Sequence, residues 1–126
     1  MFVGTDIVEV ERVKTAILRG GDKFLQRVFT QCERISINSN DPDYERAAGF
    51  WAAKESVVKS VGLGFREGIR FHDAEIEHDK FGCPHFIISG HLKDVMEDKK
   101  INAISLSISH CRTHAIAVTV ISSQKD

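Results

Sequence analysis

Residues 44–64, which read YERAAGFWAAKESVVKSVGLG, constrain the fold of this chain more than any other segment. Their broad apolar face and small alanines predict a long helix at the centre of the core. The segment closes on Gly62-Leu63-Gly64, and a glycine there can adopt the left-handed conformation that ends a helix. Glu55, Lys59 and Gly62 fall at i, i+4 and i+7, so one stripe of the helix carries an acid, a base and a glycine.

This stripe has two interpretations. A carboxylate and an ammonium group one turn apart, beside a flexible turn, could hold a metal ion and a phosphate. Gly62 and Gly64 would leave backbone N–H groups accessible to that phosphate. The same two side chains could instead form an ordinary surface pair, which contributes about 0.2–0.5 kcal/mol. The helix alone does not decide between them.

The rest of the chain predicts an α+β fold in one domain, residues 1–126. Two short helices, separated by Gly20-Gly21, are expected before the long helix, and another is expected over residues 90–99. Residues 123–126 are expected to be a frayed tail. Period-two alternation predicts a small antiparallel arrangement of strands at residues 2–8, 74–78, 85–89, 103–110 and 114–121.

Charge and cysteine content exclude several classes of protein. The formal net charge of −1 gives no overall reason to bind nucleic acid or a membrane. No apolar run approaches the ~18 residues that span a bilayer, and the amino terminus lacks the basic region of a signal peptide. Cys32, Cys83 and Cys111 are odd in number and far apart, which is typical of free thiols in a reducing compartment. We therefore expect a cytoplasmic protein.

The early helices carry a local basic patch. Asp22 is the only acid after Glu11 in a span that holds five basic residues. The patch suits an acidic partner, although a solvated charged face would look the same. Its members are Arg12, Lys14, Arg19, Lys23 and Arg27.

No P-loop, nucleophile elbow, dinucleotide fingerprint or HExxH motif occurs, and the paired spacing of a zinc site is absent. What remains is carboxylates, basic side chains and glycines. Asp6 either caps the first helix or acts as a functional carboxylate. With Glu55 it is a plausible pair of oxygen ligands for Mg²⁺. His110, which ends a serine-rich strand, either binds an anion or takes part in proton transfer, or it simply hydrogen-bonds the following turn.

Four segments, GTDIVEVERV, FLQRVFTQCE, WAAKESVVKSVGLG and SISHCRTHAIA, occur in this order. Together they resemble the bacterial holo-[acyl-carrier-protein] synthases, a family of small phosphopantetheinyl transferases. The resemblance covers nearly the whole chain. It implies the 4′-phosphopantetheinyl transferase fold, in which a small antiparallel sheet packs against a long central helix and shorter N-terminal helices. It also implies homotrimers with active sites at subunit interfaces.

The implied reaction moves 4′-phosphopantetheine from coenzyme A to a serine of acyl carrier protein, releases adenosine 3′,5′-bisphosphate and serves fatty acid biosynthesis. By the same resemblance, Asp6 and Glu55 would hold Mg²⁺ on the coenzyme A pyrophosphate. Lys59 would contact phosphate, and Gly62 and Gly64 would form the adjacent loop.

The resemblance assigns the nucleotide end of coenzyme A to His110 and the acidic helix of the carrier protein to Arg12, Lys23 and Arg27. Three positions depart from the family pattern: Cys111 and His114, which follow His110, and Phe50, which stands where an arginine is usual. We expect Arg46, one turn earlier, to replace that arginine in binding the nucleotide. A non-catalytic coenzyme A or nucleotide-binding module and a magnesium-dependent phosphohydrolase are the competing hypotheses.

Overall fold

The structure is a computed structural model that describes residues 1–65 and 68–123. Its elements confirm the expected α+β fold. Residues 124–126 of the expected frayed tail lie outside the described residues. In chain order the elements are β1 (Phe2–Glu9), α1 (Val10–Val28), α2 (Gln31–Ile37), α3 (Tyr44–Ser60), the 3₁₀ turn η1 (Phe71–Asp73), β2 (Ala74–His78), β3 (Pro84–Ile88), α4 (Gly90–Asp98), β4 (Ala103–His110) and β5 (His114–Ser122).

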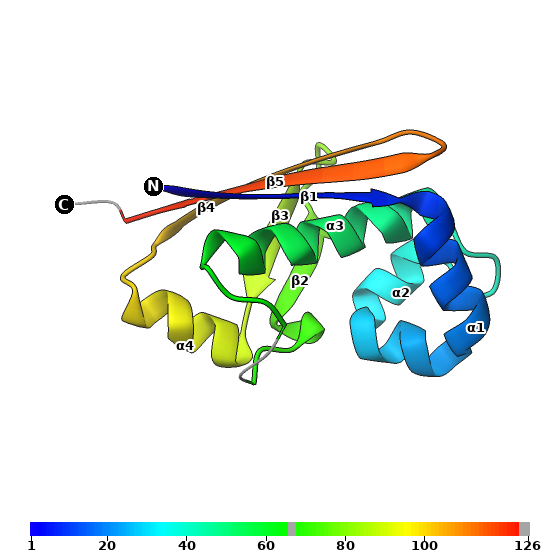
Figure 1. Cartoon of the computed structure of the whole chain (residues 1–126), viewed down its shortest axis with the longest axis horizontal. Coiled ribbons are helices and arrows are strands. Elements are labelled where there is room, and N and C mark those ends of the chain that lie inside the picture. Colours follow the sequence, from blue (N-terminus) through cyan, green and yellow to red (C-terminus); the bar gives the residue numbers. More distant parts are fainter. Residues whose placement is uncertain (66–67, 124–126) are drawn as a thin grey trace.

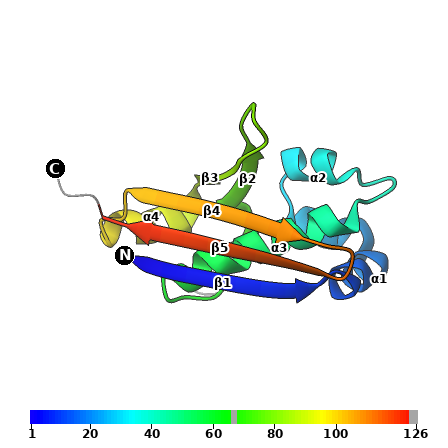
Figure 2. The same ribbon diagram turned by 90° about the horizontal axis from the view of Figure 1, so that it is seen from above.

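The strands form two antiparallel sheets rather than one. β1, β5 and β4 make a three-stranded sheet in that order, and β2 pairs with β3 as a separate hairpin. The long helix α3 lies along one face of the three-stranded sheet, with α1 and α2 at one end and α4 at the other (Figure 1). Figure 2 shows the opposite face of this sheet without a helix over it.

Helix α3 approaches β1 closely because residue 4 is glycine. A Cβ at Gly4 would collide with the backbone carbonyl of Ser56. Beside this contact, the buried hydroxyl groups of Ser56 and Thr119 lie 2.6 Å apart and satisfy each other. The close approach brings the helix-facing residues of β1 against the last turns of α3.

Helix α1 breaks where the two glycines predict it. Gly21 has φ 56° and ψ −143°, so the chain changes direction there and two helical pieces follow one another. The buried side chains of the first piece include Val13 and Ile17, and those of the second are Leu25 and Val28. The predicted break is therefore confirmed.

The interpretation of Asp6 as a helix cap is wrong. β1 continues to Glu9, which pairs with His114, and Asp6 lies inside the strand opposite Ala117. The cap position of α1 is Glu9, which makes no side-chain capping hydrogen bond. Pairing with β5 extends the strand past the point where the sequence pattern alone suggested a helix start.

Candidate active site

Asp6 and Lys59 form an ion pair across β1 and α3. Lys59 Nζ lies 2.9 Å from Asp6 Oδ1 and donates a second hydrogen bond to the carbonyl of Thr5 at 3.2 Å. The Asp6 side chain is 13% exposed, whereas that of Lys59 is 51% exposed. Lys59 is thus paired with a residue of β1. The interpretation as a surface pair of Lys59 with Glu55 is replaced by this contact between segments far apart in the sequence.

Glu55 lines a hollow together with Asp6. The hollow has a volume of about 350 Å³ and is otherwise walled largely by apolar side chains, among them Phe24 and Trp51. Burial raises the pKa of Glu55, the nearby Asp6 carboxylate raises it further, and Lys59 partly offsets both effects. Two carboxylates in a partly dry hollow are an arrangement that a cation would stabilise.

The glycine loop after α3 is used differently from its expected role. The Gly62 N–H donates to Lys59 O and the Leu63 N–H donates to Val58 O, both at 3.0 Å. This is a Schellman cap, and Gly62 supports it with φ 80°. The expectation that Gly62 offers a free N–H to phosphate is therefore wrong in this structure, because the helix end already uses that group. Gly64 follows in an open part of the loop.

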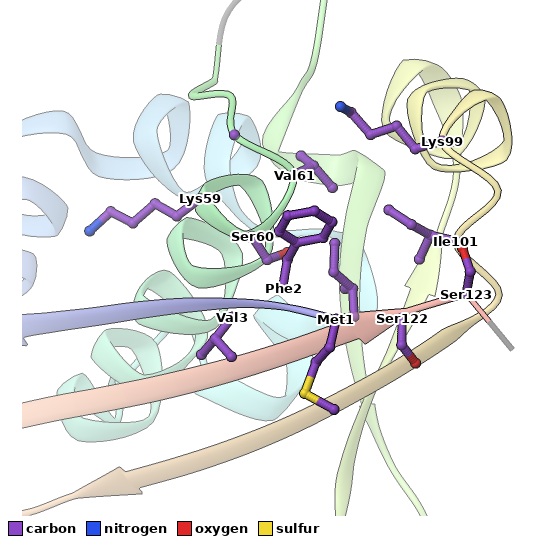
Figure 3. A pocket seen from close by; sticks show the side chains of 12 residues that line it. Met1, Phe2, Val3, Lys59, Ser60, Val61, Lys99, Ile101, Ser122 and Ser123 are labelled. Atoms are coloured by element: carbon purple, nitrogen blue, oxygen red, sulfur yellow. The ribbon is translucent and has the colours of Figure 1, made fainter.

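A larger hollow of about 600 Å³ opens on the other side of Lys59. Figure 3 shows Phe2 and Val3 from β1, Val61 from the end of α3 and Ile101 from the segment after α4 arranged around it. Its lining also includes the polar residues Lys59, Ser60, Lys99, Ser122 and Ser123. A mixed lining next to Lys59 suits a long, uncharged chain attached to a phosphate.

Arg46 and His110 line a third hollow, of about 180 Å³, with Phe50 in its wall. His110 Nδ1 lies 2.9 Å from Glu45 Oε1, so its partner is on α3 and the interpretation as a residue bonded only to its turn is wrong. Arg46 Nη1 donates to Ser36 Oγ at 2.7 Å.

The predicted site residues therefore gather in two groups. Asp6 and Glu55 share one hollow with Lys59 at its edge, while Arg46 and His110 share another. Helix α3 supplies both groups from different faces, since Arg46, Gly49 and Phe50 face one hollow and Trp51 and Glu55 face the other.

The basic patch is largely a free surface. Arg12, Arg19, Lys23 and Arg27 are all exposed. Lys14 is half-buried, with its ammonium group 5.4 Å from the centre of the Tyr44 ring. Leu18, 65% exposed, is an apolar side chain on the surface of the same helix.

Sequence reasoning missed a buried ion pair between Glu33 and Lys54, whose side chains are both fully buried. A signal was present, because Thr30 and Glu33 have the spacing of a capping box, which α2 forms. No sequence pattern of this kind indicated that Glu33 would pair with Lys54.

The residues present fit a magnesium ion. Within residues 1–65 and 68–123 no three or more His, Cys, Asp or Glu side chains cluster as a metal cage. Mg²⁺ does not need one, since one or two carboxylates with water and substrate phosphate complete its shell. Asp6 and Glu55 provide that pair, and the pKa of Glu55 is raised first by burial and then by the neighbouring Asp6 carboxylate.

Comparison with known proteins agrees with this architecture. A family model described as the 4′-phosphopantetheinyl transferase superfamily matches residues 2–119. A holo-[acyl-carrier-protein] synthase of Verminephrobacter eiseniae is 41% identical over 96% of this chain and 92% of its own length. One from Thermoanaerobacter sp. is 46% identical, over 95% of this chain and 86% of its own length.

Solved structures show the same fold. The Helicobacter pylori holo-[acyl-carrier-protein] synthase in complex with coenzyme A has a TM-score of 0.85 and 32% identity, over 95% of this chain and 99% of that one. The Neisseria meningitidis enzyme has a TM-score of 0.87 and 30% identity, over 97% and 98% of the two chains. The chain belongs to the 4′-phosphopantetheinyl transferase superfamily and, within it, to the holo-[acyl-carrier-protein] synthase family of enzymes.

Proposed function

We propose that this enzyme transfers 4′-phosphopantetheine from coenzyme A to a serine of apo acyl carrier protein, with Mg²⁺, in fatty acid biosynthesis. The observation that carries the proposal is the convergence of Asp6, Glu55 and Lys59 from β1 and α3 at the edge of two hollows. The Helicobacter pylori relative, whose structure is a complex with coenzyme A, supports the choice of donor.

Positioning and charge neutralisation supply most of the catalysis in phosphoryl transfer. Asp6 and Glu55 would hold Mg²⁺, which when bound would neutralise charge on the pyrophosphate of coenzyme A. Lys59, whose ammonium group is half exposed, would turn from Asp6 to a phosphate oxygen and stabilise charge there. The hollow of about 600 Å³ beside Lys59 would take the pantetheine chain.

The acceptor serine comes from the partner, so the chain needs no nucleophile of its own. The exposed Arg12, Lys23 and Arg27 would bind acidic side chains of the carrier protein, and Leu18 would contact an apolar one. Such a basic rim mainly raises the rate of encounter and orients the partner.

A homotrimer with sites between subunits fits the division of the predicted site into two hollows. The face of the three-stranded sheet that α3 does not cover carries exposed β-branched side chains, including Val3, Ile7 and Ile116 at 56%, 67% and 42% exposure. An uncovered apolar face is typical of an interface between subunits. Sedimentation equilibrium tests this, and a fully active monomer would contradict it.

None of the described helices is long and apolar enough to cross a membrane. We place the enzyme in the cytoplasm, and the three exposed free thiols are consistent with a reducing compartment.

The experiment is to incubate the protein with apo acyl carrier protein, coenzyme A and Mg²⁺ and to weigh the carrier protein by mass spectrometry. We expect a gain of one phosphopantetheinyl group, which EDTA abolishes. A non-catalytic coenzyme A-binding module is the alternative, and it predicts binding without any mass gain. Absence of the adduct from folded protein would therefore reject the transferase.

A further inference from the structure

The hollow between α3, the β2–β3 hairpin and the end of β4 gathers three side chains that can carry positive charge. Arg46 reaches it from α3, His78 from the end of β2 and His110 from the end of β4. Carboxylates near these side chains already have partners, since Glu45 Oε1 lies 2.9 Å from His110 Nδ1 and Asp43 lies 3.8 Å from Arg46. The hollow is therefore suited to an anion.

His78 has a defined position in this hollow. Its ring packs against Phe50, with 5.9 Å between the ring centres and 37° between their planes, and Phe50 is itself buried. The hairpin that carries His78 is held by Asp79, whose Oδ1 accepts the N–H groups of Phe81 at 2.8 Å and Cys83 at 3.0 Å. A side chain on an ordered turn, backed by a buried ring, is preorganised to bind.

The charges around His78 point the same way. Burial lowers the pKa of His78, and Arg46 and then His85 lower it further, with only Asp79 acting in the opposite direction. A histidine whose neighbours disfavour its protonation lies in a region of positive potential. An anion bound there would relieve that repulsion and gain hydrogen bonds from both Arg46 and His78.

We propose that His78 is a specificity-determining residue which, with Arg46, binds the phosphate on the ribose of coenzyme A. The inference rests on the proposed function and adds to it a residue on the β2–β3 hairpin. Coenzyme A carries two separate anionic groups, and the pyrophosphate is already assigned to the hollow of Asp6 and Glu55. The hollow at His78 has a volume of about 180 Å³, which admits a phosphate and part of a ribose rather than a whole nucleotide.

Phe50 explains why a second hydrogen-bond donor is needed. The family resemblance places an arginine at that position, and a phenylalanine ring donates no hydrogen bond to a phosphate. Arg46 replaces that charge only in part, because its guanidinium also donates to Ser36 and lies near Asp43. His78, packed on Phe50, supplies the remaining donor.

The test measures the affinity of wild-type enzyme and variants for coenzyme A and for 3′-dephospho-coenzyme A by isothermal titration calorimetry. We expect wild type to prefer coenzyme A by about 10-fold or more, as befits charge-assisted hydrogen bonds. His78→Ala should weaken coenzyme A about 5- to 10-fold and change dephospho-coenzyme A less than about twofold. His78→Arg should keep the preference.

His85→Ala is the matched control, since His85 belongs to the same hairpin but pairs with Glu77 at 3.7 Å, outside the residues that line the hollow. Because His85 can act on an anion in the hollow only through its charge, this variant should weaken coenzyme A by less than about twofold and leave 3′-dephospho-coenzyme A unchanged. The proposal is wrong if His78→Ala weakens both ligands equally or neither, if His85→Ala matches it, or if wild type does not distinguish the ligands. In each of those cases transfer to the carrier protein still tests the proposed function separately.

Discussion

Lys54 of α3 and Glu33 of α2 form an ion pair with 2.9 Å between Nζ and Oε1, and both side chains are completely buried. The remaining hydrogen-bonding capacity of the pair is used. Lys54 Nζ donates to the carbonyls of Phe71 at 3.0 Å and Ala74 at 2.9 Å. Glu33 accepts the N–H of Thr30 at Oε1 and that of Ile76 at Oε2, at 2.8 and 2.7 Å. This ion pair thus connects α2, α3 and the start of the β2–β3 hairpin. Lys54 immediately precedes Glu55 in the sequence of α3.

Removing one partner of this pair should destabilise the protein strongly. Lys54→Met leaves the Glu33 carboxylate buried without its cation, and we expect the free energy of unfolding in urea to fall by about 3–5 kcal/mol. Lys59→Met is the control, because Lys59 is exposed and its pair with Asp6 should contribute no more than about 1 kcal/mol. Equal losses for the two variants would show that the buried pair has no special role.

Glu55→Gln should abolish transfer while making the metal-free protein more stable. The pKa of Glu55 is raised, so ionising it in the folded protein costs stability, and this cost is present above the folded pKa and vanishes below the unfolded one. In EDTA the variant should therefore resist urea better than wild type at about pH 8, and the difference should disappear towards about pH 4. Mg²⁺ should then stabilise only wild type. A variant less stable than wild type at both pH values would contradict this account.

The sequence predicted the elements well because their signals are local. Local interactions along the chain determine the helix break at Gly20 and Gly21, the alternating strands β4 and β5 and the helix α3 with its small residues. A sequence pattern therefore predicts each of them. The ion pair of Glu33 and Lys54 was missed because the two residues are 21 positions apart along the chain. The sequence around either residue gives no indication of its partner. The role of Asp6 was undecided for a similar reason. Only the pairing of β1 with β5 shows that the strand extends past Asp6.

The candidate site was predicted in its residues more than in its geometry. A family resemblance supplied Asp6, Glu55 and Lys59, but periodicity gave no indication that Lys59 would pair with Asp6 rather than with Glu55. The N–H of Gly62 was expected to be free, but it donates to a carbonyl group at the end of α3. The last carbonyl groups of a helix lack donors within the helix and take them from the residues that follow.

Gly4 should not tolerate a side chain. In Gly4→Ala the new methyl group would meet the Ser56 carbonyl, so α3 would have to move off β1, and we expect a loss of about 1–3 kcal/mol or more in urea unfolding. Gly64→Ala is the matched control, since a Cβ there meets no atom within 4 Å and its φ is not positive. Because α3 carries Glu55 and Lys59, Gly4→Ala should also lower transfer activity below what its folded fraction explains. Unchanged stability in Gly4→Ala would mean that the two elements are not in close contact.

Lys59→Met should separate catalysis from stability. Lys59 is exposed, lines the larger hollow and pairs with Asp6 of the other, so the variant should fold normally and lose about 10²–10³ in kcat, the range for one electrostatic contact to a developing charge. Lys93 is exposed on α4 and lines neither hollow, so Lys93→Met serves as a control for simple loss of positive charge. Steady-state kinetics with both variants check this, and comparable kcat values for the two would remove Lys59 from the proposed mechanism.

The basic patch should act on the carrier protein and not on coenzyme A. Charge reversal by Arg27→Glu leaves the metal pair and the hollows intact, because Arg27 is exposed on the second piece of α1. We expect KM for apo acyl carrier protein to rise roughly 3- to 10-fold through a slower encounter, with KM for coenzyme A unchanged. Lys93→Glu reverses an exposed charge on α4, at the other end of the molecule, and should change neither constant (Figure 1). Raising the salt concentration should shrink the difference between Arg27→Glu and wild type, since screening weakens attraction between exposed charges. An equal effect of Lys93→Glu, or a difference that persists at high salt, would place the carrier-protein surface elsewhere.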